Sequence, residues 1–177
     1  MIVTTDPLIE DVLGSYRDAC GRDLPGYRGH VYRTFNLARR LLPGSAHAEA
    51  LAAVAAFHDI GIWADGTFDY LEPSSQRAAE YVREHLPQLD GAAIGHTIRL
   101  HHKLTSCLQQ GGAGAEAFRR ADLIDLTFGI VRFGLPRSFV TELRAAFPNA
   151  GFHRCLFRVA ARWALRHPAR PLPMLSW

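Results

Sequence analysis

Cysteine, lysine and long apolar runs are all scarce in this sequence of 177 residues. The three cysteines, Cys20, Cys107 and Cys155, are odd in number, far apart and without a CxxC spacing. This pattern argues against a disulfide framework and favours a reducing compartment. No apolar run approaches the ~18–20 residues that cross a bilayer, and the segment MIVTTDPLIEDVL has neither the basic leader nor the apolar core of a signal peptide. We therefore expect a cytoplasmic protein that does not interact with membranes.

Lysine is represented by Lys103 alone, so arginine carries almost all of the positive charge behind the formal net charge of +3. The arginines are scattered along the chain rather than gathered in a stripe, which argues against a nucleic-acid-binding surface. A phosphate-bearing small molecule is compatible with this charge. The hydrophobic content of 48% and the charged content of 21% are ordinary for a globular protein. The length fits a single domain, residues 1–177, with a sizeable core.

Apolar residues recur at helical spacing through most of the chain, and no segment alternates as a β-strand would. The pattern predicts an all-α, single-domain bundle of about seven helices. Candidate helices cover residues 7–20, 30–42, 46–58, 75–85, 92–105, 116–128, 136–147 and 152–167. Loops are expected over 21–29, 61–73 and 107–115, and the proline-rich tail after 167 is expected to pack back on the body.

An apolar run, Leu51–Phe57, ends in two adjacent polar residues, His58 and Asp59. Burying such residues without partners would cost roughly 2–7 kcal/mol for even a neutral group. A divalent cation satisfies a histidine and an aspartate together. The pair also fits an ordinary helix end, because Gly61 is a natural stop and a histidine there suits the helix dipole. The choice between these two interpretations depends on other residues of the chain.

Two further residues have the chemistry of metal ligands. His30 opens a predicted helix and Asp122 lies inside a later one, each beside an apolar stripe, so both can face the bundle interior. Together with His58 and Asp59 they supply two imidazoles and two carboxylates, which suit Zn, Mn, Fe, Co or Ni better than Ca. Asp125 lies one helical turn beyond Asp122 and is the alternative ligand. We expect it to orient a ligand instead.

The segments GHVYRTFNLA, AAFHDIG and RRADLID resemble the H…HD…D pattern of the HD superfamily of metal-dependent phosphohydrolases. The resemblance covers about residues 27–130 and includes the spacing between the first two histidines. It implies an HD-type helical core and a divalent transition metal held by His30, His58, Asp59 and Asp122. It also implies a metal-dependent hydrolase that acts on a small phosphorylated compound, such as a nucleotide.

Members of that superfamily with two metals have additional histidines between HD and the last aspartate. His101, in IRLHHKL, resembles one of them and lies on the inward line of Ile94 and Ile98. The adjacent His102 points about 100° away on a helix and is expected at the rim or surface. The other additional histidine has no match. In its place Glu72 precedes a predicted helix, as a substitute ligand, a general base or an ordinary N-terminal carboxylate. The pattern therefore favours one ion, with two as the alternative.

A phosphate substrate also needs cationic partners. Lys103 follows the histidine pair and Arg33 lies one turn from His30, so both are candidates for binding an oxyanion near the metal. Asp59 would hold the metal and help to position the attacking water. Two alternative functions stay open. One is a diiron oxygenase of the same superfamily, acting on a small organic or phosphonate substrate, and the other is an HD domain that binds a nucleotide without turnover.

Overall fold

The computed structural model of the chain describes residues 1–44 and 47–175. Within these ranges every regular element is helical, which confirms the prediction of an all-α bundle with about seven helices. The longer helices are α1 (Pro7–Ser15), α3 (Leu24–Leu41), α4 (Ala48–Phe57), α6 (Leu71–His85), α7 (Gly91–Leu100), α8 (Leu108–Leu126), α9 (Arg137–Ala146) and α10 (Phe152–Arg166). The short ones are α2 (Arg17–Cys20), the 3-10 turn η1 (Gly21–Asp23) and α5 (Gly61–Ala64). The predicted helix start at 46 and the last tail residues, 176–177, lie outside the described residues.

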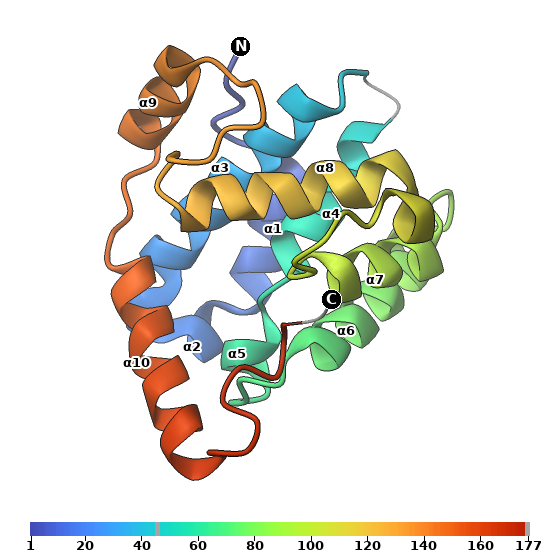
Figure 1. Cartoon of the computed structure of the whole chain (residues 1–177). Coiled ribbons are helices and arrows are strands. Elements are labelled where there is room, and N and C mark those ends of the chain that lie inside the picture. Colours follow the sequence, from blue (N-terminus) through green and yellow to red (C-terminus); the bar gives the residue numbers. More distant parts are fainter. Residues whose placement is uncertain (45–46, 176–177) are drawn as a thin grey trace.

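Helix α4 lies at the centre of the bundle and packs against α1, α3, α6 and α7 (Figure 1). Every residue from Leu51 to Phe57 is buried. From Leu51 onward the helix therefore has no exposed face, which explains why this part of its sequence shows a continuous apolar run instead of an amphipathic pattern. Helix α8 lies along α3, and α6 lies along α7. This arrangement places the residues that follow α4 between α3, α7 and α8.

The expected loop at 21–29 is helical, formed by η1 and the beginning of α3. Pro25 lies in the first turn of α3, where its missing N–H costs nothing. Gly26 and Gly29 allow close packing instead of a turn. A Cβ on Gly26 would lie 3.1 Å from the backbone at the start of α10, and one on Gly29 would lie 2.8 Å from the carbonyl oxygen of Pro148. His30 consequently lies in the second turn of α3 rather than at its entrance.

Two other expected loops are also partly helical. Helix α5 falls within 61–73, and α6 begins at Leu71 rather than near residue 75. In the segment 107–115, α8 begins at Leu108 and is kinked at Gly112, whose φ of 74° is a conformation that glycine adopts without steric cost. The glycine-rich sequence has no apolar stripe, so periodicity alone did not indicate a helix there.

The tail returns to the body of the molecule as far as it is described. Met174 is buried in a small cluster with Ile62, Phe68 and Tyr70, beside the end of α4. None of the helices in the described ranges combines the length and the apolar character needed to span a membrane.

Candidate metal centre

Polar side chains from α3, α8 and the residues that follow α4 and α7 meet in the middle of the bundle. All are buried except His102, which follows α7 and is 14% exposed. We call this group the His/Asp cluster. Its members are His30, His58, Asp59, His101, His102 and Asp122.

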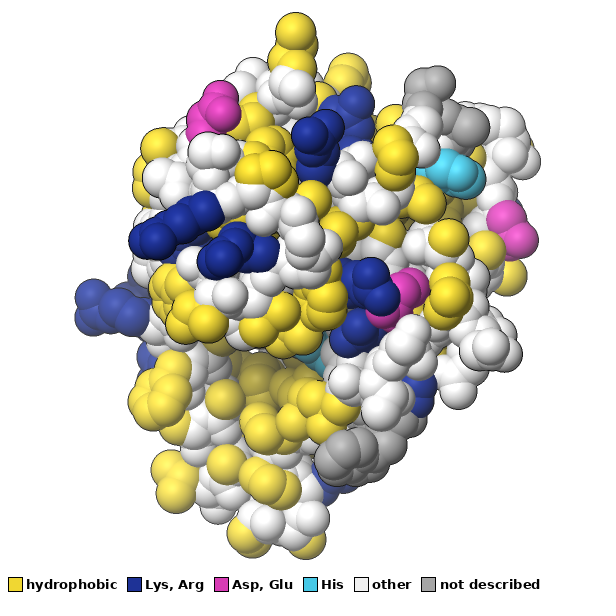
Figure 2. All heavy atoms as spheres, turned by 45° about the horizontal axis from the view of Figure 1, so that its top comes forward, with side chains coloured by type: hydrophobic (Ala, Val, Ile, Leu, Met, Phe, Trp, Pro, Cys, Tyr) yellow, Lys and Arg dark blue, Asp and Glu magenta, His cyan; other side chains and the backbone are white. Residues whose placement is uncertain are grey.

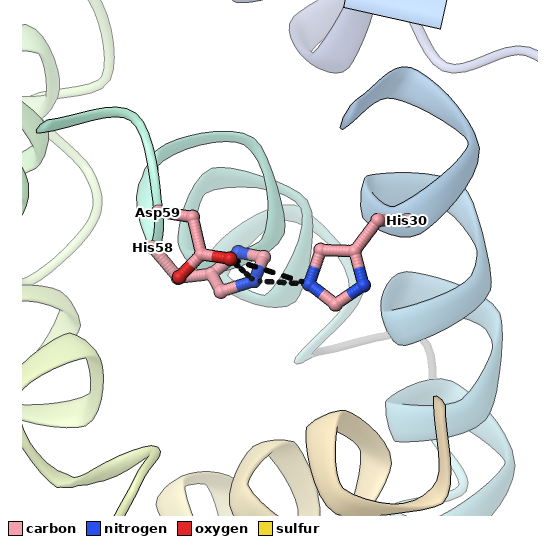
Figure 3. A group of neighbouring side chains, drawn as sticks. All are labelled: His30, His58 and Asp59. Carbon is pink, nitrogen blue, oxygen red and sulfur yellow. Dashed lines mark hydrogen bonds and ion pairs between the residues drawn. The ribbon is translucent and has the colours of Figure 1, made fainter. Parts of the chain in front are cut away.

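One side of the His/Asp cluster is built by His30, His58 and Asp59 (Figure 3). The Nε2 atoms of the two histidines are 2.8 Å apart, and Oδ2 of Asp59 lies 3.5 Å from each of them. Oδ1 of Asp122 lies 3.4 Å from Nε2 of His30. For comparison, two nitrogens bound at 2.0–2.1 Å to one ion and at right angles are about 3 Å apart. Four potential ligand atoms therefore converge from three helical elements.

The other side of the cluster is built by His101 and His102. Nε2 of His101 lies 3.4 Å from Oδ1 of Asp59, and Nδ1 of His102 lies 3.4 Å from Oδ2 of Asp122. Asp59, His101 and His102 form a second set whose ligand atoms all lie within 4.8 Å of one another. Each aspartate thus presents one oxygen to each side of the cluster.

Hydrogen bonds on the far side of each ring orient the histidines. Nδ1 of His58 and of His101 lies 2.8 Å and 2.6 Å, respectively, from the backbone carbonyl oxygen three residues earlier. A carbonyl oxygen only accepts, so these Nδ1 atoms carry the proton and Nε2 presents a lone pair to the cluster. Nδ1 of His30 lies 2.7 Å from Oδ2 of Asp125. A carboxylate in this position commonly orients a histidine that binds a metal.

Several buried polar atoms of the cluster lack hydrogen-bond partners among the described residues. They are Oδ1 of Asp59, Nε2 of His101 and both carboxylate oxygens of Asp122. In the described part of the chain, three buried carboxylates, including that of Asp125, face one buried guanidinium, that of Arg33, and one half-buried guanidinium, that of Arg144. Such unpaired buried groups and excess negative charge are expensive in an apolar interior. The donor set and its charge therefore fit a divalent cation.

The charge distribution perturbs the titration of these groups. Burial disfavours the charged form of His30, but hydrogen bonds with Asp125 and Asp59 outweigh it and raise its pKa to about 9. Burial lowers the pKa of His58 to about 3, assisted by the neighbouring His30. Burial raises the pKa of Asp122 to about 7. Opposed shifts of this kind within one buried group are typical of functional sites.

Arg33 does not fill its predicted role as a substrate-binding cation. Its side chain is 1% exposed and donates from Nε and Nη2 to the two carboxylate oxygens of Asp125, at 2.6 and 2.9 Å. Nη1 donates to the carbonyl oxygens of Phe147 and Pro148. Because all three guanidinium nitrogens are occupied, the prediction is wrong. Arg33 instead compensates the charge of Asp125.

Glu72 and Lys103 have different surroundings. The Glu72 side chain is 57% exposed on α6, where its carboxylate lies 3.3 Å from Arg99, and no contact within the described ranges joins it to the cluster. The structure therefore contradicts the prediction of Glu72 as a ligand or base. Lys103 is 8% exposed and directly follows His102. Its ammonium group makes no ion pair with any described residue, so Lys103 stays a candidate for binding substrate.

His102 was expected at the rim or surface. It is the most exposed member of the cluster, at 14%, but its Nδ1 also lies 3.4 Å from Oδ2 of Asp122. Helix α7 ends at Leu100, and a turn replaces the helical continuation that had been predicted to residue 105. The 100° separation of adjacent helical residues therefore does not apply to His101 and His102. Nε2 of His102 lies 2.6 Å from the hydroxyl of Tyr70, which holds the ring in place.

The role of Glu116 was not predicted from the sequence, although this residue secures the segment that directly follows the two histidines. Its buried carboxylate accepts a hydrogen bond from the backbone N–H of Cys107 at 2.9 Å and two from Arg119 at 2.9 and 2.8 Å. Arg119 in turn donates to the carbonyl oxygen of Lys103. These bonds tie the segment 103–107 to α8. A glutamate beside two arginines in a glycine-rich stretch gave no sequence signal for such a role.

No family model, curated protein or solved structure matches this chain. The buried His/Asp cluster could hold a metal ion and is compatible with the H…HD…D pattern. The resemblance to the HD superfamily therefore depends on these residues and on the all-helical fold.

We predict that Asp125→Asn keeps the metal but weakens its binding by about 10–100-fold, as is typical when a group that orients a ligand is altered. Asn keeps an oxygen that can accept from Nδ1 of His30 but loses the charge. Titration of metal against a chelator measures the change. Asp122→Asn is the matched variant and should empty the site, because it removes a charge from the cluster itself. The opposite result would show that the roles of the two aspartates are exchanged.

Proposed function

We propose that this protein is a metal-dependent hydrolase that acts on a small phosphorylated compound. The observation that carries the proposal is a set of buried potential ligand atoms at the centre of the bundle that have no hydrogen-bond partner among the described residues. They belong to Asp59, His101 and Asp122. Imidazole and carboxylate together suit a divalent transition metal such as Mn, Fe, Zn, Co or Ni. When bound, such an ion lowers the pKa of a water ligand toward about 7 and polarises a phosphoryl oxygen.

We further propose two ions rather than the single ion that the sequence pattern favoured. The reason is His102, which completes a second group of potential ligands with His101 and Asp59. Asp59 and Asp122 each have one oxygen near either group, so both carboxylates are positioned to bridge. The adjacent His101–His102 pair would then replace the separated histidines of the two-metal pattern.

Substrate is expected to approach from the side of His102. This histidine is the member of the cluster with the largest exposure, at 14%, while the side chain of Asp59 is 2% exposed. Lys103 follows it in the chain, and its ammonium group is suited to bind a phosphoryl oxygen. Asp59 lies at the centre of the cluster, where it would hold metal and orient the attacking water. The hydroxyl of Tyr70 would keep His102 aligned.

A diiron oxygenase is the second candidate function. One observation favours it, namely that two groups of nitrogen and oxygen ligands share Asp59, as a pair of iron ions would require. Binding of a nucleotide without turnover is less compatible with the structure, because a purely regulatory domain does not need a complete buried cluster.

Elemental analysis of the purified protein, followed by an assay of phosphate release, tests the hydrolase proposal. Metal-free protein is reloaded with each of the five metals and offered a panel of phosphate esters that includes nucleotides. Release of phosphate by the wild type, but not by Lys103→Ala with its metal content intact, is the expected result. No release with any metal would contradict the proposal. About two irons per chain with an oxygen-dependent spectrum would favour the oxygenase.

Removal of either adjacent histidine should reveal the number of ions. We predict that His101→Ala and His102→Ala each lower the metal content from about two per chain to about one, because each removes a ligand of the second group. Measurement of metal per chain by mass spectrometry decides this. His167→Ala, an exposed histidine at the end of α10, is the control and should keep the wild-type content. One ion in the wild type and in both variants would indicate a single-metal site.

A further inference from the structure

A cavity of about 460 Å³ lies between α9 and the turn that follows α8, and it shares no residue with the His/Asp cluster. Three arginines line it. Arg137 and Arg144 lie on one face of α9 together with Thr141, and Arg132 comes from the turn. The spacing of 137, 141 and 144 is that of residues on a single helical face. One helix thus directs two guanidinium groups and a hydroxyl toward the same space.

Among the residues that the structure describes, none that lines this cavity is acidic. The guanidinium of Arg137 makes no ion pair or hydrogen bond with the described residues, and Arg132 donates to the carbonyl oxygen of Gly129 at 3.0 Å. Nη1 of Arg144 lies 3.5 Å from a carboxylate oxygen of Asp125 but forms no hydrogen bond in the described part of the chain. Asp125 is already bound by Arg33 and faces His30. Arg132 and Arg137 therefore have no counter-ion among the described residues, whereas Arg144 shares Asp125 with Arg33.

The lining of the cavity is positively charged and partly apolar. Figure 2 shows several groups of Lys and Arg side chains on one face of the molecule, one of them against an acidic side chain. Phe128 and Ile130 form part of the cavity wall and are 52% and 81% exposed. Large apolar side chains at this exposure beside a charged cavity are typical of a ligand-binding surface.

We propose that this cavity is a second binding site, for a small organic phosphate. A planar guanidinium suits the oxygens of a phosphate group. Three guanidinium groups line this cavity, and those of Arg132 and Arg137 have no ion pair among the described residues. The volume is within the range of small-molecule sites, roughly 300–1,000 Å³. Phe128 and Ile130 would contact the organic part of the ligand, while the arginines and Thr141 bind its phosphate.

This proposal does not depend on hydrolase activity. It can be tested in metal-free protein, in which the His/Asp cluster has an excess of carboxylates and does not attract anions. Failure of the hydrolase proposal would leave the arginine-lined cavity unaffected, and absence of binding here would leave the metal centre unaffected.

Isothermal titration of chelator-treated protein with AMP and with inorganic phosphate is the test. We expect both to bind, and AMP to bind more tightly because it also contacts the apolar wall. Arg137→Gln and Arg132→Gln should each weaken binding about tenfold, the effect of losing one charge-assisted hydrogen bond. Arg17→Gln, an exposed arginine of α2 outside this cavity, is the matched control and should bind like the wild type.

Circular dichroism establishes that the variants are folded. Because Arg137 is exposed and has no described partner, its replacement leaves the packing of α9 intact. The proposal is overturned if AMP and phosphate do not bind, or if they bind equally to the wild type and to Arg137→Gln. It is also overturned if the metal-free protein binds only to vesicles of anionic lipid, since the cavity would then belong to a membrane-binding surface.

Discussion

Asp59→Ala is expected to abolish metal binding and the thermal stabilisation that metal provides. The carboxylate of Asp59 lies between the two histidine groups, 3.5 Å from Nε2 of His30 and 3.4 Å from Nε2 of His101. Its loss removes a charged ligand from both. A metal present at 100 times its dissociation constant stabilises the folded state by about 2.7 kcal/mol. For a protein of this size, that corresponds to a rise in melting temperature of about 5–11 °C.

The melting temperatures of chelator-treated and metal-loaded protein measure this effect. We expect a difference for the wild type and none for Asp59→Ala. The metal-free variant should be no less stable than metal-free wild type, because it has one buried carboxylate fewer to leave unpaired. Asp18→Ala, at an exposed aspartate of α2, is the control and should keep the full metal-dependent difference. Full metal occupancy in Asp59→Ala would show that Asp59 is not a ligand.

Arg33→Ala is expected to destabilise the fold by about 3–5 kcal/mol, whether or not metal is present. Arg33 is buried, binds both oxygens of Asp125 and donates to two backbone carbonyls. Its removal would leave Asp125 as an uncompensated buried charge. The melting temperature should fall by about 10 °C, since a change of 1 kcal/mol corresponds to about 2–4 °C at this chain length. Urea denaturation of metal-free protein measures the free energy of unfolding.

Arg28→Ala is the matched control, because Arg28 also pairs with a carboxylate, that of Glu10, but is 38% exposed. An exposed pair contributes about 0–1 kcal/mol, so this variant should unfold almost as the wild type does. A variant Arg33→Ala with wild-type stability and a raised KM for a phosphate ester would instead support the substrate-binding role that the sequence suggested.

Much of the fold could be predicted from the sequence. Helical periodicity is local, so the all-α class and most helix centres were evident. The loop predicted at 21–29 was wrong because its glycines serve helix packing, and a contact such as that of Gly29 with Pro148 cannot be recognised from neighbouring residues. The kinked start of α8 was missed for a related reason, since its glycines leave no apolar pattern.

The convergence of His30, His58, Asp59 and Asp122 was also predictable, because each lies beside an apolar stripe that had to face the interior. The spacing of one helical turn from Asp122 predicted that Asp125 orients a ligand, and the structure shows that this residue is His30. These inferences needed the geometry of single helices and the resemblance to the H…HD…D pattern. They predicted a candidate metal centre but not its second group of ligands.

Tertiary structure alone decided the roles of His102, Arg33 and Glu72. His102 reaches the cluster because the chain leaves the helix at Leu100, and no periodicity describes the direction of side chains in a turn. The guanidinium of Arg33 binds an aspartate that is 92 residues away in the sequence. This contact exists only in the folded chain, so the sequence did not indicate that Arg33 is unavailable to a substrate. The carboxylate of Glu72 has the chemistry of a metal ligand, but packing of α6 against α7 turns this side chain toward Arg99 and solvent. The sequence determines which side chains have the right chemistry, whereas long-range packing decides which of them meet, because helix–helix contacts join residues that are distant along the chain.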